Sequence, residues 1–209
     1  MKTWLIIVIV LIIVGSLIFI FSDHINLFFE KGNFNKKVGK KIYQIALDND
    51  YYLISQVALE IDTKIVHFDY ILFTNKFIYC VGARYFNGPI SGKYDDNQWF
   101  KYGKKSEIDH IKNPLILPKV RLEYLKGALK APDDLFVSLV VVNDSCLIDK
   151  NNQYPTYNQL INLKDLKFLI SKKEKENIAD INPSQLQKLV KNIYKRSVKT
   201  QQKEKNEIN

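Results

Sequence analysis

The sequence predicts an α/β domain, in which helices flank a mixed β-sheet, preceded by one N-terminal transmembrane helix. Two observations predict the domain. Segments with helical periodicity alternate with short runs rich in β-branched and aromatic residues. Their order of helix, three strands, helix, strand and two helices suits a layered domain with a mixed sheet. The third observation is an uncharged run of eighteen residues, Trp4–Phe21, which would span roughly 27 Å as a helix, close to the thickness of a hydrocarbon core.

The flanks of this apolar run favour a retained anchor, at residues 1–22, over a cleaved signal peptide. A signal peptide needs a shorter apolar core and a cleavage site made of small residues, whereas this run ends in the bulky sequence IFIFSDH. Lys2 alone precedes the run, and five lysines follow it between Lys31 and Lys41. Because positive residues stay on the cytoplasmic side, we expect a single-pass protein of the cell membrane whose C-terminal domain lies in the cytoplasm.

Residues 23–36 are predicted to be a juxtamembrane linker, and residues 38–46 carry apolar side chains at helical spacing. Three apolar runs then predict strands, and the short break at Asn75-Lys76 indicates a hairpin between the last two. These predicted strands cover residues 51–61, 64–74 and 76–83.

The second half of the chain begins with a polar, glycine-containing loop, predicted from Tyr85 to Lys112. A helix is expected after Pro114, and the continuous apolar run Asp134–Asn143 is typical of a strand covered on both faces. Residues 158–171 are predicted to be a short helix. Asn182 and Pro183 form a good cap and first turn for a last helix.

The charge and the cysteines restrict the function only loosely. The chain has a net charge of +9 and a pI near 9.3, which suits nucleic acid or anionic lipid as a partner. It is also crowded with Ile, Asn, Lys and Tyr throughout, so the lysine excess alone does not choose between them. Cys80 and Cys146 lie in apolar runs without metal-ligand spacing, and we expect both to be buried, reduced thiols.

Four short segments occur in an informative order: Gly39–Tyr43, His67–Tyr70, Val81–Gly88 and Asn113–Leu117. They resemble the motifs of the nuclease-related domain, a family with a restriction-endonuclease-like fold. The family reads Gly-x-x-Gly-Glu, Gln-Ile-Asp-His, Ile-Glu-x-Lys-Asn-x-x-Gly and Asn-Pro-x-x-Gln in these places. The resemblance covers roughly residues 38–147. It implies a nuclease-related domain, which we place at 37–172. The charge of the remaining residues predicts a basic helix and tail at 173–209.

The resemblance implies a site in which two acidic groups and a lysine surround one phosphate, with Mg²⁺ held by the carboxylates. At the matched positions this chain has Tyr43 and Gly82 in place of the two glutamates, Arg84 in place of the lysine, and Leu117 in place of the glutamine. Asp69 alone is retained. We therefore expect a degenerate nuclease without a cofactor, in which any residual activity would use Mg²⁺ held weakly by Asp69.

Several side chains could still contact a ligand. Arg84 offers a permanent positive charge to a phosphate, Lys40 and Lys41 add to it, and Trp99 would either stack on a base or pack over the edge of the sheet. DNA and RNA both remain possible partners.

Other acidic residues could compensate for the lost glutamates. Glu60 and Asp62, near a strand end, could approach Asp69 across the hairpin. His67 and Asp69 share a strand face, either as a residual metal pair or as a structural hydrogen-bonded pair.

Three functions are compatible with the sequence. The first is a membrane-anchored, inactive nuclease relative that presents a cytosolic cleft for nucleic acid or phosphate. The second is a membrane-associated scaffold that binds proteins without nucleic acid, and the third is a divergent Mg²⁺-dependent nuclease. The last helix allows three roles as well: its apolar stripe, Leu186 to Ile193, could dock on the domain, or its basic face could contact lipid or nucleic-acid phosphates.

Overall fold

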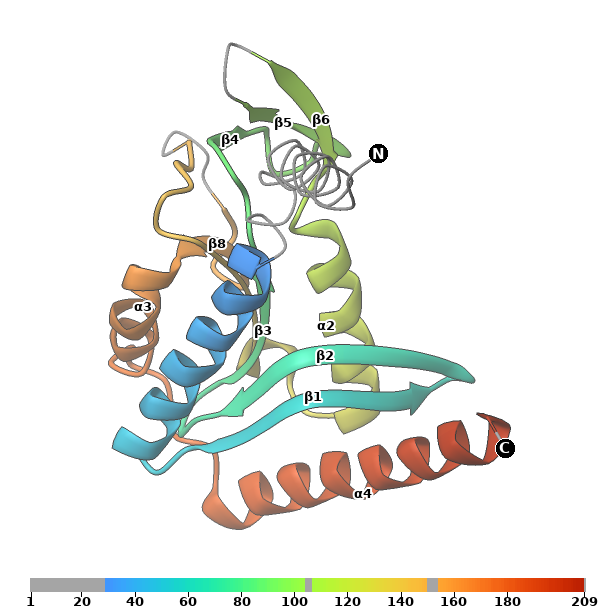
Figure 1. The fold of residues 1–209 in the computed structure, drawn as a ribbon. Coiled ribbons are helices and arrows are strands. Elements are labelled where there is room, and N and C mark those ends of the chain that lie inside the picture. Colours follow the sequence, from blue (N-terminus) through green and yellow to red (C-terminus); the bar gives the residue numbers. More distant parts are fainter. Residues whose placement is uncertain (1–28, 104–106, 150–153, 209) are drawn as a thin grey trace, which may run out of the picture.

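A five-stranded sheet with the strand order β1-β2-β3-β7-β8 forms the centre of the molecule, and helices cover both of its faces (Figure 1). The structure is a computed structural model that describes residues 29–103, 107–149 and 154–208. The predicted anchor therefore lies outside the described residues. Within those three ranges, no helix is long and apolar enough to cross a bilayer. The predicted α/β class with a mixed sheet flanked by helices is confirmed.

The first described element is a helix over residues 29–48. It includes residues 29–36, which the sequence analysis placed in a linker. Phe34 lies one turn before Val38 and continues the buried stripe of the helix. Its ring packs against that of Tyr85, with 6.0 Å between the ring centroids. The end of the expected linker is thus part of the folded domain.

Three antiparallel strands follow the helix, and all three were predicted: β1 (Tyr52–Ile61), β2 (Lys64–Phe73) and β3 (Ile78–Arg84). Asp62 and Thr63, both with positive φ, make the tight turn between β1 and β2. Gly39 lets the first helix approach this sheet closely, because a Cβ atom there would lie 2.8 Å from the Tyr70 hydroxyl oxygen.

The remaining strands of the sheet are parallel to β3. Strand β7 (Phe136–Val142) is buried along its whole length, as predicted, and pairs with β3 on one side and with β8 (Asn158–Asn162) on the other. Helix α3 (Leu166–Lys173) begins only after β8, so the helix predicted for residues 158–171 is wrong in its first part. Asn162 shows why: its amide donates to the carbonyls of Asn143 and Cys146, a tertiary contact that local pattern does not reveal.

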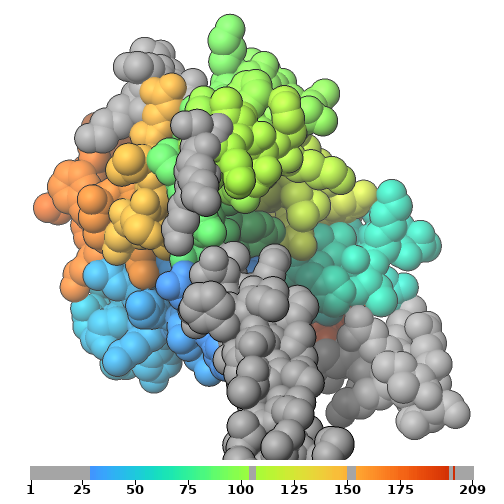
Figure 2. Space-filling model, turned by 45° about the horizontal axis from the view of Figure 1, so that its top comes forward, coloured from blue at the N-terminus to red at the C-terminus, as the bar shows by residue number. Residues whose placement is uncertain are grey.

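A second, smaller sheet replaces the predicted loop between β3 and α2. It consists of β4 (Ile90–Ser91), β5 (Gln98–Tyr102) and β6 (Ile108–Lys112). Figure 2 shows it, in green, as a protrusion at one end of the molecule. Gly88 leads into this sheet with φ +145°, where an added Cβ would clash with the Tyr102 carbonyl oxygen.

Two helices cover each face of the large sheet. Helix α2 (Ile116–Leu129) and helix α4 (Pro183–Ile208) pack on the face that carries Ile78 and Cys80, and the helix over 29–48 and α3 pack on the other face. The apolar stripe of α4 is docked on the domain, with Leu186, Leu189 and Ile193 in the core that α2 shares. Its lysines at 188, 191 and 195 are exposed.

The N-terminus of α4 is capped by Asn182, whose Oδ1 accepts a hydrogen bond from the Ser184 N–H at 2.9 Å. We expect Asn182→Ala to lower the free energy of unfolding by about 1 kcal/mol, because this N–H then loses its partner. Asn182→Asp should keep most of the stability. Urea denaturation of the full chain in mild detergent measures the difference, and a loss in the Asp variant equal to that in the Ala variant would contradict the assigned cap.

Candidate functional site

Neighbouring strands β2 and β3 bring Asp69 and Arg84 together. The Asp69 Oδ2 atom accepts hydrogen bonds from the Ala83 N–H at 3.2 Å and from Arg84 Nη1 at 3.4 Å. The Asp69 side chain is 28% exposed and that of Arg84 33% exposed. Arg84 also donates to the carbonyl oxygen of Ala83 at 2.7 Å. The retained carboxylate is therefore held in a partly exposed ion pair with a permanent cation.

Gly82 lies beside this pair and leaves room for a larger side chain. A Cβ atom added there would lie 3.6 Å from Asp69 Oδ2, an ordinary van der Waals distance, and the backbone of Gly82 is not in the left-handed region. A carboxylate at position 82 would meet that of Asp69. The site lacks a second acidic group only because residue 82 is a glycine. The backbone at this position would accept a glutamate.

The other two degenerate positions lie on different helices. Tyr43 is 60% exposed on the helix over 29–48, which packs on the sheet face that carries Val81 and Ala83. Gly82 and Arg84 alternate with those residues and so face α2 instead. Leu117 is 50% exposed in the first turn of α2. The structure thus brings Asp69, Gly82 and Arg84 together, while Tyr43 belongs to the layer on the other side of the sheet.

The acidic residues proposed to compensate do not approach the site. The register pairs Glu60 with Ile65, four residues along β2 from Asp69, which corresponds to about 13 Å. Asp62 lies farther away, in the turn. His67 is exposed two residues before Asp69. In the part of the chain that the structure describes, no cluster of three or more His, Cys, Asp or Glu side chains could hold a metal ion.

Trp99 was expected either to stack on a base or to pack over the edge of the sheet, and in this structure its ring is not exposed to a ligand. Its side chain is fully buried beneath the small sheet. The indole Nε1 donates to the Lys93 carbonyl at 2.8 Å, and the ring stacks on Tyr154 with 6.2 Å between the ring centroids. The alternative expectation, packing at the edge of the sheet, matches this environment. Lys40 is exposed and Lys41 half-buried on the first helix.

Arg121 is a basic residue near the sheet that the sequence analysis did not consider. It lies on α2 one turn after Leu117 and is half-buried. Burial raises the pKa of the Cys80 thiol to about 12, while the charge of Arg121 lowers this pKa and that of Asp69 raises it. Both charges therefore act on Cys80, which lies two residues before Gly82 on the same strand face. The spacing of four residues between Leu117 and Arg121 places both side chains on one face of α2 and could have been read from the sequence.

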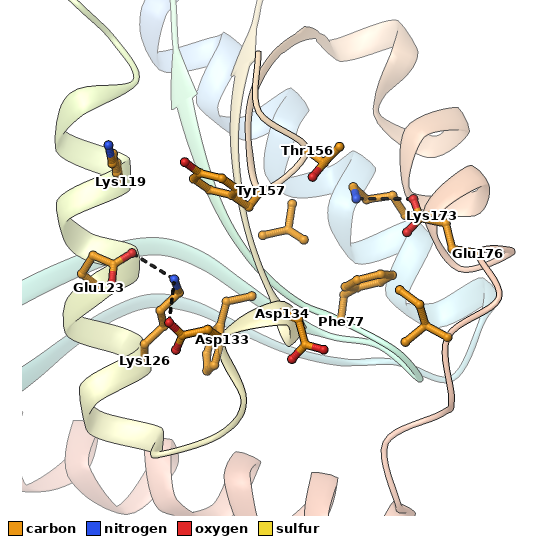
Figure 3. Close-up of a pocket in the computed structure, with 13 residues that line it drawn as sticks. Phe77, Lys119, Glu123, Lys126, Asp133, Asp134, Thr156, Tyr157, Lys173 and Glu176 are labelled. Carbon is orange, nitrogen blue, oxygen red and sulfur yellow. Dashed lines mark hydrogen bonds and ion pairs between the residues drawn. The ribbon is translucent and has the colours of Figure 1, made fainter. Parts of the chain in front are cut away.

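None of the three described cavities has Asp69, Gly82 or Arg84 in its lining. The cavity in Figure 3, of about 570 Å³, opens at the start of β7, whereas Arg84 pairs with Val142 at the end of that strand. Figure 3 shows that opposite charges pair within this cavity: Lys126 contacts Glu123 and Asp133, and Lys173 contacts Glu176.

Comparisons with known proteins relate the sequence to one family. The sequence profile of the nuclease-related domain matches residues 31–143. Among solved structures, the crystal structure of protein of unknown function AF1548 is similar with a TM-score of 0.35 and 6% identity, covering 70% of this chain and 61% of that one. No curated protein matches the chain.

Proposed function

Because the chain belongs to the nuclease-related domain family, we propose that it is a catalytically inactive relative that binds nucleic acid at the membrane. In this proposal residues 1–22 anchor the protein, and the nuclease-related domain presents the site around Asp69 and Arg84. The observation that carries the proposal is the ion pair between these two side chains, 3.4 Å apart, with Gly82 beside them.

The ion pair argues against hydrolysis. A dedicated Mg²⁺ site in a nuclease uses more than one carboxylate to hold the metal ion. The metal ion then activates a water molecule and stabilises the leaving oxygen. Here Asp69 already neutralises a guanidinium that cannot lose its proton. A metal ion would have to displace Arg84 and would find one acidic ligand from this pair of strands.

The same arrangement favours binding of a phosphate. Arg84 is a permanent cation in a partly exposed position beside Asp69, and the charge of Arg121 on α2 acts on Cys80 of the same strand. Lys40 and Lys41 lie on the first helix, which packs on the other face of the sheet. With a chain charge of +9, contacts to a phosphate backbone would release counterions and give salt-dependent affinity. A free phosphate that contacts one arginine should bind with much lower affinity than a polymer that contacts several cations at once.

We expect Arg84→Ala to weaken the binding of nucleic acid by about tenfold, because a charged hydrogen bond to a phosphate is lost. The variant should also show a shallower dependence of affinity on salt. Fluorescence anisotropy with labelled single- and double-stranded DNA and RNA at two salt concentrations, on the full chain in detergent, measures both quantities. Lys167→Ala is the matched control, since Lys167 pairs with Asp48 on the opposite side of the sheet.

A cleavage assay on the same oligonucleotides, with Mg²⁺, Mn²⁺ or EDTA, completes the test. Binding without cleavage supports the proposal. Metal-dependent cleavage that disappears in Asp69→Ala would show an active nuclease and overturn the assignment as inactive. Absence of binding to every oligonucleotide would leave a membrane-associated scaffold as the function.

A further inference from the structure

One face of the small sheet exposes apolar side chains to solvent. The register pairs Gln98 with Lys112, Phe100 with His110 and Tyr102 with Ile108, so these six residues share one face, here called the outer face. All six are exposed; Phe100 is 41%, Tyr102 39% and Ile108 56% exposed. The alternate residues Trp99 and Ile111 point to the other face and pack against the domain.

The small sheet that carries the outer face lies at the end of the domain where the first helix, residues 29–48, begins. The first helix touches the segment before β4, because the Tyr85 hydroxyl donates to Glu30 and the Tyr85 ring packs on Phe34. Figure 1 shows the small sheet at this end of the molecule and α4 at the opposite end. The six residues 23–28 reach at most about 22 Å when fully extended. In the proposed function, the start of the first helix must therefore stay within about that distance of an anchor that ends at residue 22.

We infer that the outer face docks on the headgroup region of a bilayer that contains anionic lipid. This inference rests on the membrane anchor of the proposed function. Aromatic and aliphatic side chains next to lysine are the residue types that partition into a membrane interface. Phe100, Tyr102 and Ile108 supply the apolar contact, and Lys112 supplies a positive charge that complements anionic headgroups.

The packing within the face favours lipid over nucleic acid. Bases stack on an open aromatic surface. The Phe100 ring instead meets the His110 ring at 57°, with 5.1 Å between the ring centroids, and Tyr102 lies opposite the aliphatic Ile108. The Tyr102 hydroxyl is also hydrogen-bonded with Ser91 Oγ at 3.1 Å. Because α4 lies at the opposite end of the molecule, its exposed lysines would not contact the bilayer on which the outer face docks.

A fluorescent label at position 108 tests the inference in the full chain. The two native cysteines are buried, and burial raises the thiol pKa to about 12 for Cys80 and about 11 for Cys146, so maleimide at neutral pH should label an introduced cysteine selectively. Ile108→Cys and the control Tyr194→Cys, on the exposed side of α4, carry an environment-sensitive dye. Both are reconstituted into vesicles of phosphatidylcholine and phosphatidylglycerol in equal amounts, with nitroxide-labelled lipid as quencher.

We expect the dye at position 108 to be quenched several-fold more than the dye at position 194, and Phe100→Glu in the labelled chain to reduce this difference. Equal quenching at the two positions would overturn the inference, and so would protection of position 108 by an added single-stranded oligonucleotide instead of lipid. Alkaline extraction of the same vesicles separates the two hypotheses. A chain that is extracted has no anchor, so the proposed function fails; a retained chain with an unquenched position 108 refutes the docking surface alone.

Discussion

Replacing Gly82 with Glu together with Arg84 with Lys should create metal-dependent cleavage of nucleic acid at least ~100-fold above that of the unaltered chain. The double change removes the guanidinium that pairs with Asp69 and places a second carboxylate beside it. The geometry permits this, because a Cβ at position 82 would lie 3.6 Å from Asp69 Oδ2 without backbone strain. Two carboxylates in contact repel each other, and a divalent cation relieves that repulsion.

The measurement combines cleavage of labelled DNA and RNA with calorimetric titration of Mn²⁺. The matched control is Gly82→Gln with Arg84→Lys, which has the same size but lacks the second carboxylate and should neither bind the metal nor cleave. Adding Asp69→Ala to the active variant should abolish the activity. If the double variant binds Mn²⁺ but remains inactive, a second carboxylate beside Asp69 is not sufficient for cleavage and the prediction is wrong. If it binds no metal, our description of the site is wrong.

Trp99→Ala should lower the free energy of unfolding by about 3–5 kcal/mol, which is among the largest effects expected from one substitution. The side chain is fully buried in a cluster with Ile90, Val140 and Cys146. Truncation leaves a cavity and also leaves the Lys93 carbonyl without its indole donor. Trp99→Phe should lose less, since it keeps most of the apolar contact. Urea denaturation of the full chain in detergent measures these differences.

The neighbouring Phe100 provides the control for this prediction. It lies on the same strand but is 41% exposed, so Phe100→Ala should change the stability by no more than about 0.5 kcal/mol. Similar losses for the two variants would mean that the inner and outer faces of the small sheet are assigned incorrectly. A weaker affinity for nucleic acid in Trp99→Phe, at unchanged stability, would restore the base-stacking role that burial excludes.

The parts of the fold that the sequence predicted have strong local patterns. Strand β7 is apolar at nearly every position, and β1, β2 and β3 are long runs of β-branched and aromatic residues. Strands β4, β5 and β6 were missed because each is at most five residues long and the alternation is masked: Trp99 points inward while Phe100 and Tyr102 point outward. Strand β8 was missed because it begins and ends with asparagine, whose amide contacts depend on distant segments.

The sequence predicted the central pair of the site but not the residues around it. Motif spacing placed Asp69 and Arg84 on adjacent strands, and pairing made them neighbours. Spacing could not reveal that Glu60 lies opposite Ile65, because register depends on the whole hairpin. Arg121 was missed for a related reason: its position depends on how α2 docks on the sheet, which no single segment specifies.

Helix α4 belongs to the folded domain but lies outside the segment that matches the family. The family match ends at residue 143, yet the core under α2 is closed by Ile181, Leu186, Leu189 and Ile193. Farther along the same helix, Thr200 Oγ1 accepts the Glu60 N–H of the edge strand β1. A fragment cut at the homology boundary would therefore expose one side of the sheet and an open strand edge, which invites aggregation. The segment that matches the family and the segment that folds as one unit therefore have different lengths.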